Sequence, residues 1–324
     1  MVNIKDDKTL VEKKYNRALF YRRYGIGMVM IGMIVFLSLT TSFLRINNIL
    51  NVLSTIAING ALACGMVFVI TAGGIDLSVG SMLAWGSITV GMLLRETQNI
   101  PFAVAVTILS CTAFGFLNGL LIAKFDLFPF VATLATQLVI RGLATAICGG
   151  YSFPIAVAAF SKVGLGKFMD IIPYPMIILI GLVIVSYFLM HWTKFGRYVY
   201  AVGGNRNAAE AAGISIFWTR ILTFTYSGFC AGVASLIMTA RISASQPNIG
   251  IGYETDAIAA CVIGGTSFAG GIGTIPGTAM GIVIIGLIYN GMNLIGIKSF
   301  WQVVSKGLLI IGAVLIDLLI NKKR

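Results

Sequence analysis

Few residues of this 324-residue chain could perform acid–base, nucleophilic or metal chemistry. His191 is the single histidine, and the five cysteines form no CxxC pair, so a zinc site and a disulfide framework have little support. The chain has no GxxxxGK[ST] phosphate loop, so ATP must be hydrolysed elsewhere if it is used. We therefore expect no catalytic residue and no metal ligand, which argues against an enzyme.

The polar residues that could bind a solute stand beside glycines. Residues 71–81 read TAGGIDLSVGS, in which Gly73, Gly74, Asp76 and Ser78 separate two apolar runs. Irregular backbone at membrane depth persists only where protein or a wet cavity surrounds it. The segment predicts a broken or re-entrant helix, with Asp76 and Ser78 capping the helix that follows. The alternative is an ordinary tight turn on the cytoplasmic side.

A second interruption covers residues 252–281, where Gly264 and Gly265 break the apolar pattern. Glu254 and Asp256 precede them, and we expect both at the outer mouth of a short helix. We expect Asp256 to cap that helix. The alternative is that the acidic pair binds a cation or a sugar hydroxyl.

The composition indicates that the helices carrying these residues lie in a membrane. Hydrophobic residues make up 58% of the chain and charged residues 10%, whereas a soluble domain has about 25% charged residues. The net charge of +12 comes from cations at the chain ends and in short loops. That pattern orients membrane spans and gives no support to nucleic acid as a partner. We predict an all-α polytopic membrane protein in a lipid bilayer.

About ten apolar runs are candidates for spanning helices. Basic residues precede the first run and follow the last, which predicts two cytoplasmic termini and an even number of spans. We expect a cytoplasmic N-terminus over 1–23, one transmembrane domain over 24–320 and a tail over 321–324. The runs are 24–41, 49–71, 78–94, 101–123, 128–148, 173–190, 217–240, 257–268, 271–295 and 300–320, and the run 257–268 is too short to span alone.

Five separated motifs resemble one family, the ribose and galactose type of ABC importer permease. They are GGIDLSVGS at 73–81, FLNGLLIA at 116–123, PFVATLATQLVIRGLA at 129–144, TKFGRYVYAVGGNRNAAEAAGI at 193–214 and YETDAIAACVIGGTSFAGGIGTIPGT at 253–278. The resemblance runs over nearly the whole chain in the expected order. It departs at Ala212 and Thr255, where members often have serine and leucine, and this leaves the substrate open.

The resemblance implies the membrane subunit of an ATP-driven monosaccharide importer in the bacterial cytoplasmic membrane. Its fold would be of the cobalamin-importer (type II) kind, with about ten transmembrane helices. Its partners would be a second permease copy, a cytoplasmic ABC ATPase and an extracytoplasmic sugar-binding protein. This chain would hold no cofactor, because the ATPase binds ATP and magnesium. Nucleosides or branched-chain amino acids remain alternative substrates.

The resemblance also gives the polar segment at about 192–220 a role as a cytoplasmic coupling loop. Its short helix, expected over 207–213 with Asn205 as N-cap and Gly213 at its end, would fit a groove on the ATPase. The alternative is a solvated loop that returns the chain to the membrane. The candidate coupling residues are Gly203, Gly204, Asn205, Arg206, Ala208, Ala209, Glu210 and Gly213.

The same matches suggest residues of a solute path. Thr133 and Thr136 would face it together with Arg141, which must reach the surface or pair with a backbone carbonyl at a broken helix. The full set of path or broken-helix candidates is Gly73, Gly74, Asp76, Ser78, Asn118, Thr133, Thr136, Arg141, Asp256, Gly264 and Gly265.

An ion-coupled secondary transporter is the main rival, and it would need a relay of acidic and histidine residues inside the membrane. Away from the predicted span ends, this chain offers almost no carboxylate. The sequence therefore favours an ATP-driven permease.

Overall fold

The computed structural model describes residues 27–321. The predicted cytoplasmic N-terminus over 1–23 and the tail beyond Asn321 lie outside these residues. A first helix covers Gly27–Thr40. The helices that follow it are α2 (Ile46–Thr71), α3 (Val79–Thr97), α4 (Ile100–Phe125), α5 (Pro129–Ile147), α6 (Ala158–Leu165), α7 (Tyr174–Trp192), α8 (Lys194–Gly204), α9 (Arg206–Ala211), α10 (Ile216–Ile242), α11 (Tyr253–Ile263), α12 (Ile275–Leu294) and α13 (Ser299–Asn321).

Six of the described helices are long and apolar enough to cross a membrane, namely α2, α4, α5, α7, α10 and α12. This confirms an all-α polytopic membrane protein. The core forms around α2, whose apolar 18-residue window is 89% buried. The corresponding windows of α4 and α5 are 22% buried and that of α7 is 28% buried. A helix that is apolar on every side is suited to such a central position.

Glycines bring α4 and α10 into close backbone contact. A Cβ atom at Gly115 on α4 would lie 3.0 Å from the Cα atom of Gly228 on α10. A Cβ atom at Gly119 would lie 2.7 Å from the Cα atom of Ile221. Small residues at such crossings let helices associate in a membrane, where apolar burial alone gives little preference for protein over lipid.

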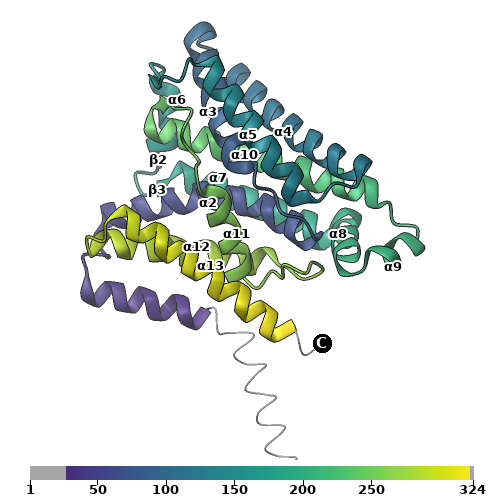
Figure 1. Ribbon diagram of the computed structural model, residues 1–324. Helices are drawn as coiled ribbons and strands as arrows, with labels where there is room; N and C mark the ends of the chain where they lie inside the picture. Colours follow the sequence, from purple (N-terminus) through teal and green to yellow (C-terminus); the bar gives the residue numbers. More distant parts are fainter. Residues whose placement is uncertain (1–26, 322–324) are drawn as a thin grey trace, which may run out of the picture.

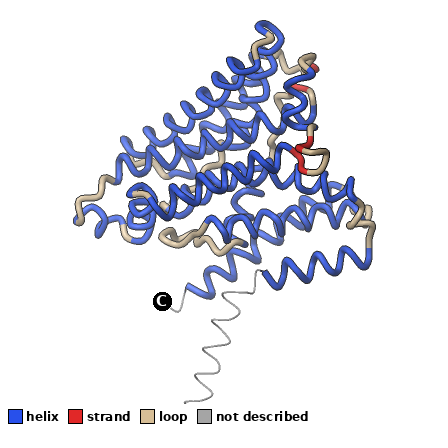
Figure 2. Tube along the Cα trace, turned by 180° about the vertical axis from the view of Figure 1, so that it is seen from behind, coloured by secondary structure: helices blue, strands red, loops and turns tan. Residues whose placement is uncertain are grey.

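Short strands and α6 occupy the segment between α5 and α7, where the sequence predicts only a loop. β1 (Phe153–Pro154) pairs antiparallel with β4 (Ala244–Ser245), and β2 (Lys167–Phe168) pairs with β3 (Ile172–Pro173). Figure 1 shows α6, β2 and β3 at one end of the helix bundle and α8 and α9 at the other. In Figure 2 the strands, drawn in red, are short interruptions in a helical molecule.

The chain between α10 and α11 turns back along α3, and we call residues 243–252 the re-entrant segment. Ser245 Oγ donates to the carbonyl of Ser87 at 2.7 Å, and a Cβ atom at Gly250 would lie 3.2 Å from Leu83 Cβ. The run predicted over 257–268 is corrected accordingly. The helix begins at Tyr253 and ends at Ile263, and the irregular backbone before it accounts for the missing length.

Candidate functional site

Asp76 lies in a buried polar cluster between α2 and α3. Its carboxylate accepts hydrogen bonds from Ser78 N at 3.0 Å, Ser78 Oγ at 2.5 Å and Ser227 Oγ on α10 at 2.8 Å. Asn118 Nδ2 on α4 donates to Ser78 Oγ at 2.8 Å. All four side chains are buried. A solvated turn would expose them, so the structure supports a helix break enclosed by protein.

The start of α3 differs in detail from the predicted cap. Asp76 accepts the amide hydrogen of Ser78, whereas the Ser78 side chain makes no capping hydrogen bond of its own. Before it, the chain leaves α2 through Gly73, which has a φ of +82°, and Gly74, whose N–H donates to Val69 O at 2.8 Å. The break therefore combines a glycine exit from one helix with an aspartate at the start of the next.

Thr133 and Thr136 do not form the shared polar face that the sequence suggested. The Thr133 hydroxyl is fully buried and lies 3.1 Å from Ile75 O and 3.2 Å from Leu77 N. Thr136 is half-buried, and its hydroxyl donates to Thr133 O within its own helix. Thr133 therefore holds the break between α2 and α3, and only Thr136 keeps an accessible side chain.

Arg141 pairs with backbone carbonyls, which is one of the two arrangements that the sequence predicts for it. Its Nη1 donates to Pro247 O at 2.8 Å and to Ile249 O at 2.6 Å, and its Nη2 donates to Gly80 O at 3.1 Å. The guanidinium thus joins α5 to the start of α3 and to the re-entrant segment. Because the side chain is half-buried, it also remains partly accessible.

Asp256 is neither a helix cap nor a group at an open mouth. The N-cap of α11 is Gly252, which has no side chain, and Asp256 is only 4% exposed. Its Oδ1 lies 2.7 Å from Lys306 Nζ on α13 and accepts a hydrogen bond from Tyr289 on α12 at 2.7 Å. Glu254, at 8% exposed, is buried as well. The acidic pair therefore lies inside the protein, and Asp256 forms an ion pair.

The glycines after α11 form a tight junction with α12. A Cβ atom at Gly264 would lie 2.7 Å from Thr278 N, while Gly265 has a φ of +88°. These residues make the sharp turn out of α11.

At the other candidate site, α9 is a short helix with the predicted N-cap. Asn205 Oδ1 accepts the amide hydrogen of Ala208 at 2.9 Å. Gly213 follows the helix with a φ of +77°, a conformation that glycine adopts without strain. The helix covers Arg206–Ala211, so it begins one residue before the predicted range 207–213 and ends two residues before its end.

One face of α9 is open and the other rests on the body of the protein. Arg206, Ala208 and Glu210 are exposed, whereas Ala209 is buried. Alanine on the exposed face gives the helix a narrow profile, and Arg206 and Glu210 provide charges at its edges. Such a surface can enter a groove on a partner protein.

The end of α8 connects this surface to the core. Tyr200 OH donates to Gly273 O at 2.6 Å, and Gly271 N donates to Thr71 O at the end of α2 at 2.8 Å. A Cβ atom at Gly203 would lie 2.7 Å from Gly271 N and 2.9 Å from the carbonyl carbon of Thr71, whereas Gly204 has open space beside it. A displacement of α8 would therefore press directly on the end of the central helix.

Asp126, between α4 and α5, holds α9 from the side. Its carboxylate accepts hydrogen bonds from Arg206 at 3.0 Å and from Arg220 on α10 at 2.7 Å. Hydrogen bonds from Arg220 and then Arg206 lower the pKa of Asp126 below its usual value. The carboxylate is therefore ionised at neutral pH and links α9 to α4 and α10.

Sequence reasoning missed Asp126, Ser227 and Lys306. Lys306 had a usable signal, since a lone lysine within an apolar run needs a partner. Ser227 had none, because a serine in an apolar helix usually bonds its own backbone. Within residues 27–321, no group of three or more His, Cys, Asp or Glu side chains could hold a metal ion.

Several known proteins resemble this chain over nearly its full length, and their names describe them as permeases for sugars. Ribose import permease protein RbsC of Bacillus subtilis (strain 168) is 42% identical over 296 residues, which are 90% of this chain and 91% of that protein. RbsC of Escherichia coli (strain K12) is 35% identical over 314 residues, covering 96% and 97% of the two chains. D-allose transport system permease protein AlsC of the same strain is 37% identical over 320 residues, covering 96% of each. No solved structure matches this chain.

A family described as "Branched-chain amino acid transport system / permease component" matches residues 48–314. The match includes the Asp76 cluster, Arg141, α9 and the Asp256–Lys306 pair. This chain belongs to that family of transport-system permease components.

Proposed function

We propose that this chain is the membrane-spanning permease subunit of an ATP-driven importer of monosaccharides. The observation that carries the proposal is identity of 35–42% with permeases named for ribose, D-allose and L-arabinose over 90% or more of the chain. The buried polar break at Asp76 and the exposed helix α9 suit such a subunit. The break could shape a path for the solute, and α9 could receive movement from an ATPase.

A branched-chain amino acid is the second candidate substrate, because the description of the matching family names it. We favour a monosaccharide, since the similar proteins named for sugars extend over nearly the whole length of this chain.

The proposed partners are a second copy of this chain, a cytoplasmic ABC ATPase and an extracytoplasmic sugar-binding protein. The ATPase would bind ATP and magnesium, and α9 with its neighbours at 192–220 would dock on it. Closure of the ATPase would then displace α8 and α9, and the contact of α8 with Thr71 would pass the movement to α2. Two copies related by a two-fold axis would enclose the path between them.

Within the path, Arg141 and Thr136 are the candidates that keep accessible side chains. Asp76, Ser78, Asn118 and Thr133 would instead fix the shape of the break, because they are buried and bonded to one another or to neighbouring backbone. A permease needs only brief contacts with a solute, and a guanidinium with spare N–H groups can offer them to sugar hydroxyls.

The same proposal gives the number of membrane spans and the side on which the two termini lie. The first helix, α3, α13 and the re-entrant segment with α11 would each cross the membrane in addition to the six long helices, which gives ten spans of one domain. Both termini would then be cytoplasmic, in the inner membrane, and the fold would be of the cobalamin-importer (type II) kind. Cysteine labelling of single sites on α6 and α9 from either side of the membrane would test this arrangement.

The decisive experiment is uptake by proteoliposomes that contain this chain, its ATPase and its binding protein, all purified from the native membrane. We expect ATP-dependent uptake of a labelled monosaccharide, with ribose, D-allose and L-arabinose tested as competitors and leucine as the comparison. Competition by leucine alone would establish the amino acid alternative. Uptake that continues without ATP and stops when the ion gradient is removed would contradict the proposal.

A further inference from the structure

The re-entrant segment is held at two points by cations from two different helices. Arg141 on α5 donates to Pro247 O and Ile249 O. The carbonyl of Gly252, three residues after Ile249, accepts a hydrogen bond from Lys306 Nζ on α13 at 3.1 Å. The same ammonium group pairs with Asp256. Irregular backbone inside a membrane needs partners for its carbonyls, and these two side chains supply them.

Gly252 is the turning point between the irregular segment and α11. Its φ of +82° lies in the left-handed region, and its carbonyl also accepts the Thr255 hydroxyl at 2.6 Å. The Lys306 ammonium thus bonds the carbonyl before α11 and a carboxylate in the first turn of α11. The side chain therefore fixes the direction in which the helix leaves the turn.

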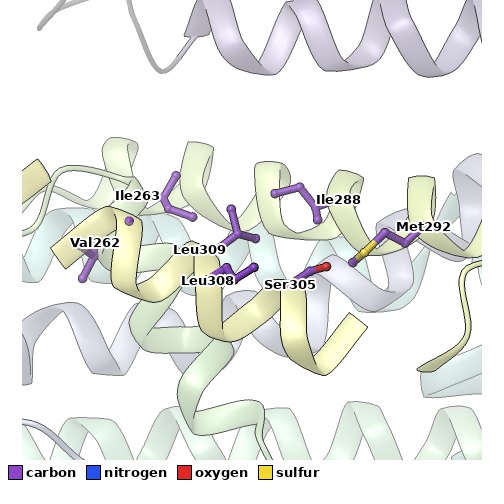
Figure 3. A pocket seen from close by; sticks show the side chains of 8 residues that line it. Val262, Ile263, Ile288, Met292, Ser305, Leu308 and Leu309 are labelled. Carbon is purple, nitrogen blue, oxygen red and sulfur yellow. The ribbon is translucent and has the colours of Figure 1, made fainter. Parts of the chain in front are cut away.

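The contacts of Lys306 also join α13 to α11. Among the described elements, α13 packs mainly against α11. A cavity of about 660 Å³ lies between α11, α12 and α13, and Figure 3 shows the largely apolar side chains that line it, including Ile288 on α12 and Leu309 on α13. Close packing against α12 thus contributes little here. Asp256, Tyr289 and Lys306 join the three helices through polar contacts. Near the start of α13, Gln302 Nε2 also donates to Asn293 Oδ1 on α12 at 2.8 Å.

We propose that Lys306 and Arg141 are positioning residues that transmit movement of α13 and α5 to the re-entrant segment. Each cation lies on a helix with exposed apolar residues and bonds backbone at one end of residues 247–252. A shift of either helix therefore moves the carbonyls beside the partly accessible Arg141. The assignment of this movement to solute passage rests on the proposed function, whereas the attachment of α13 does not.

The first test measures transport. In the complete complex, Lys306→Met and Asp256→Asn are each expected to lower uptake per folded complex by about tenfold or more. Lys306→Met leaves the buried Asp256 carboxylate without its cation, and Asp256→Asn removes the counter-charge of Lys306. They should also raise the ATP hydrolysed per solute imported, which loss of folded protein alone would not change. Lys298→Met is the matched control, since that exposed lysine forms no ion pair in the described residues. Uptake by the Lys298→Met complex should stay within about twofold of uptake by the unmodified complex.

Charge exchange separates pairing from folding. The double variant Lys306→Asp with Asp256→Lys is expected to recover folded protein and part of the uptake, because the ion pair is restored while the bond to Gly252 O is not. If the exchange is no better than Lys306→Met in both yield and uptake, the proposal is overturned.

The second test needs no ATPase and so stands apart from the proposed function. Ser305→Cys, in a Cys148→Ser background, places a thiol at the cavity between α12 and α13. Its reaction with a membrane-permeant maleimide should become faster when Lys306→Met is added, whereas Val303→Cys on the exposed face of α13 should not change. An unchanged rate at Ser305→Cys would overturn the attachment of α13 by Lys306, even in a chain that imports sugar.

Discussion

At the scale of single residues, the Asp76 cluster shows how four polar side chains stabilise a broken helix. Removing one partner of a buried hydrogen bond costs more than the bond itself contributes, because the remaining groups stay buried without a partner. Asp76 serves three donors at once, so it is the most sensitive position in the cluster.

We therefore predict that Asp76→Ala destabilises the protein by about 2–3 kcal/mol or more. The nearby Ser81→Ala should be almost neutral, since the Ser81 hydroxyl is buried without a hydrogen-bond partner. Thermal unfolding of the detergent-solubilised chain, followed by size-exclusion chromatography, measures both. Equal losses in the two variants would show that burial, and not hydrogen bonding, determines the effect.

A second pair of variants tests the different environments of the two threonines on α5. Thr133→Val removes a group that reaches Ile75 and Leu77, and it should cost about 1 kcal/mol or more. Thr136→Val removes a bond within one helix only, so the unfolding temperature should hardly change. If the order is reversed, Thr133 does not hold the break.

The sequence identified these positions better than it identified their partners. Asp76 and Arg141 stand out because a lone charge in an apolar run requires an explanation. Their partners Ser227 and Ile249 lie 151 and 108 residues away along the chain. Helix periodicity describes only neighbours within a few residues, so it could not select these partners.

At the scale of elements, α9 combines an exposed surface with firm ends. Its start and its stop were predictable, because an asparagine cap and a terminal glycine are local signals. The link through Asp126 was not, since it depends on how α4, α9 and α10 meet.

We predict that Glu210→Lys on α9 reduces ATP-dependent uptake by about tenfold through a lost charge contact with the ATPase. The unfolding temperature should remain unchanged, because Glu210 is exposed. Glu96→Lys is the control, since it makes the same change on an exposed residue at the end of α3. Comparable loss of uptake in both variants would remove α9 from the docking surface.

The link through Asp126 has a defined pH dependence. Its pKa is lowered by Arg220 and Arg206, so the contribution of the link is complete above the usual carboxyl pKa and is lost only as pH falls through the lowered value. A spin label at Ala211→Cys should therefore show constant mobility from about pH 5 to pH 9. Adding Asp126→Asn should raise that mobility at every pH in the range, and a label that is insensitive to Asp126→Asn would contradict the link.

At the scale of the whole molecule, burial divides the helices into a central group and an outer group. α2 lies inside, α10 and α12 are 67% buried over their apolar windows, and α4, α5 and α7 expose most of theirs. The apolar character of these six helices was predictable from the sequence, but this division was not, because lipid-facing and protein-facing helices are similarly apolar.

The close contact of α4 with α10 leads to a further prediction. Gly115→Leu should destabilise the chain by about 1–3 kcal/mol or more, because the added side chain meets backbone that cannot move aside. Gly181→Leu on α7 should be tolerated, since nothing lies within 4 Å of its Cβ position. Unfolding temperatures of the two variants compare the sites directly, and equal values would mean that α4 and α10 can separate at little cost.

The same contact limits the kind of motion available to the molecule. Sliding α4 along α10 by about one turn in one direction would bring Cys111, four residues away on the same face, to the place where Gly115 now faces Gly228. A Cβ atom at Gly115 would lie 3.0 Å from the Cα atom of Gly228, so the side chain of Cys111 would meet backbone there. The close contact therefore opposes shear between these helices, and we expect α4 and α10 to turn together. The hinges of any transport cycle then belong at the positive-φ glycines that flank α10, which are Gly213 before it and Gly250 and Gly252 after it.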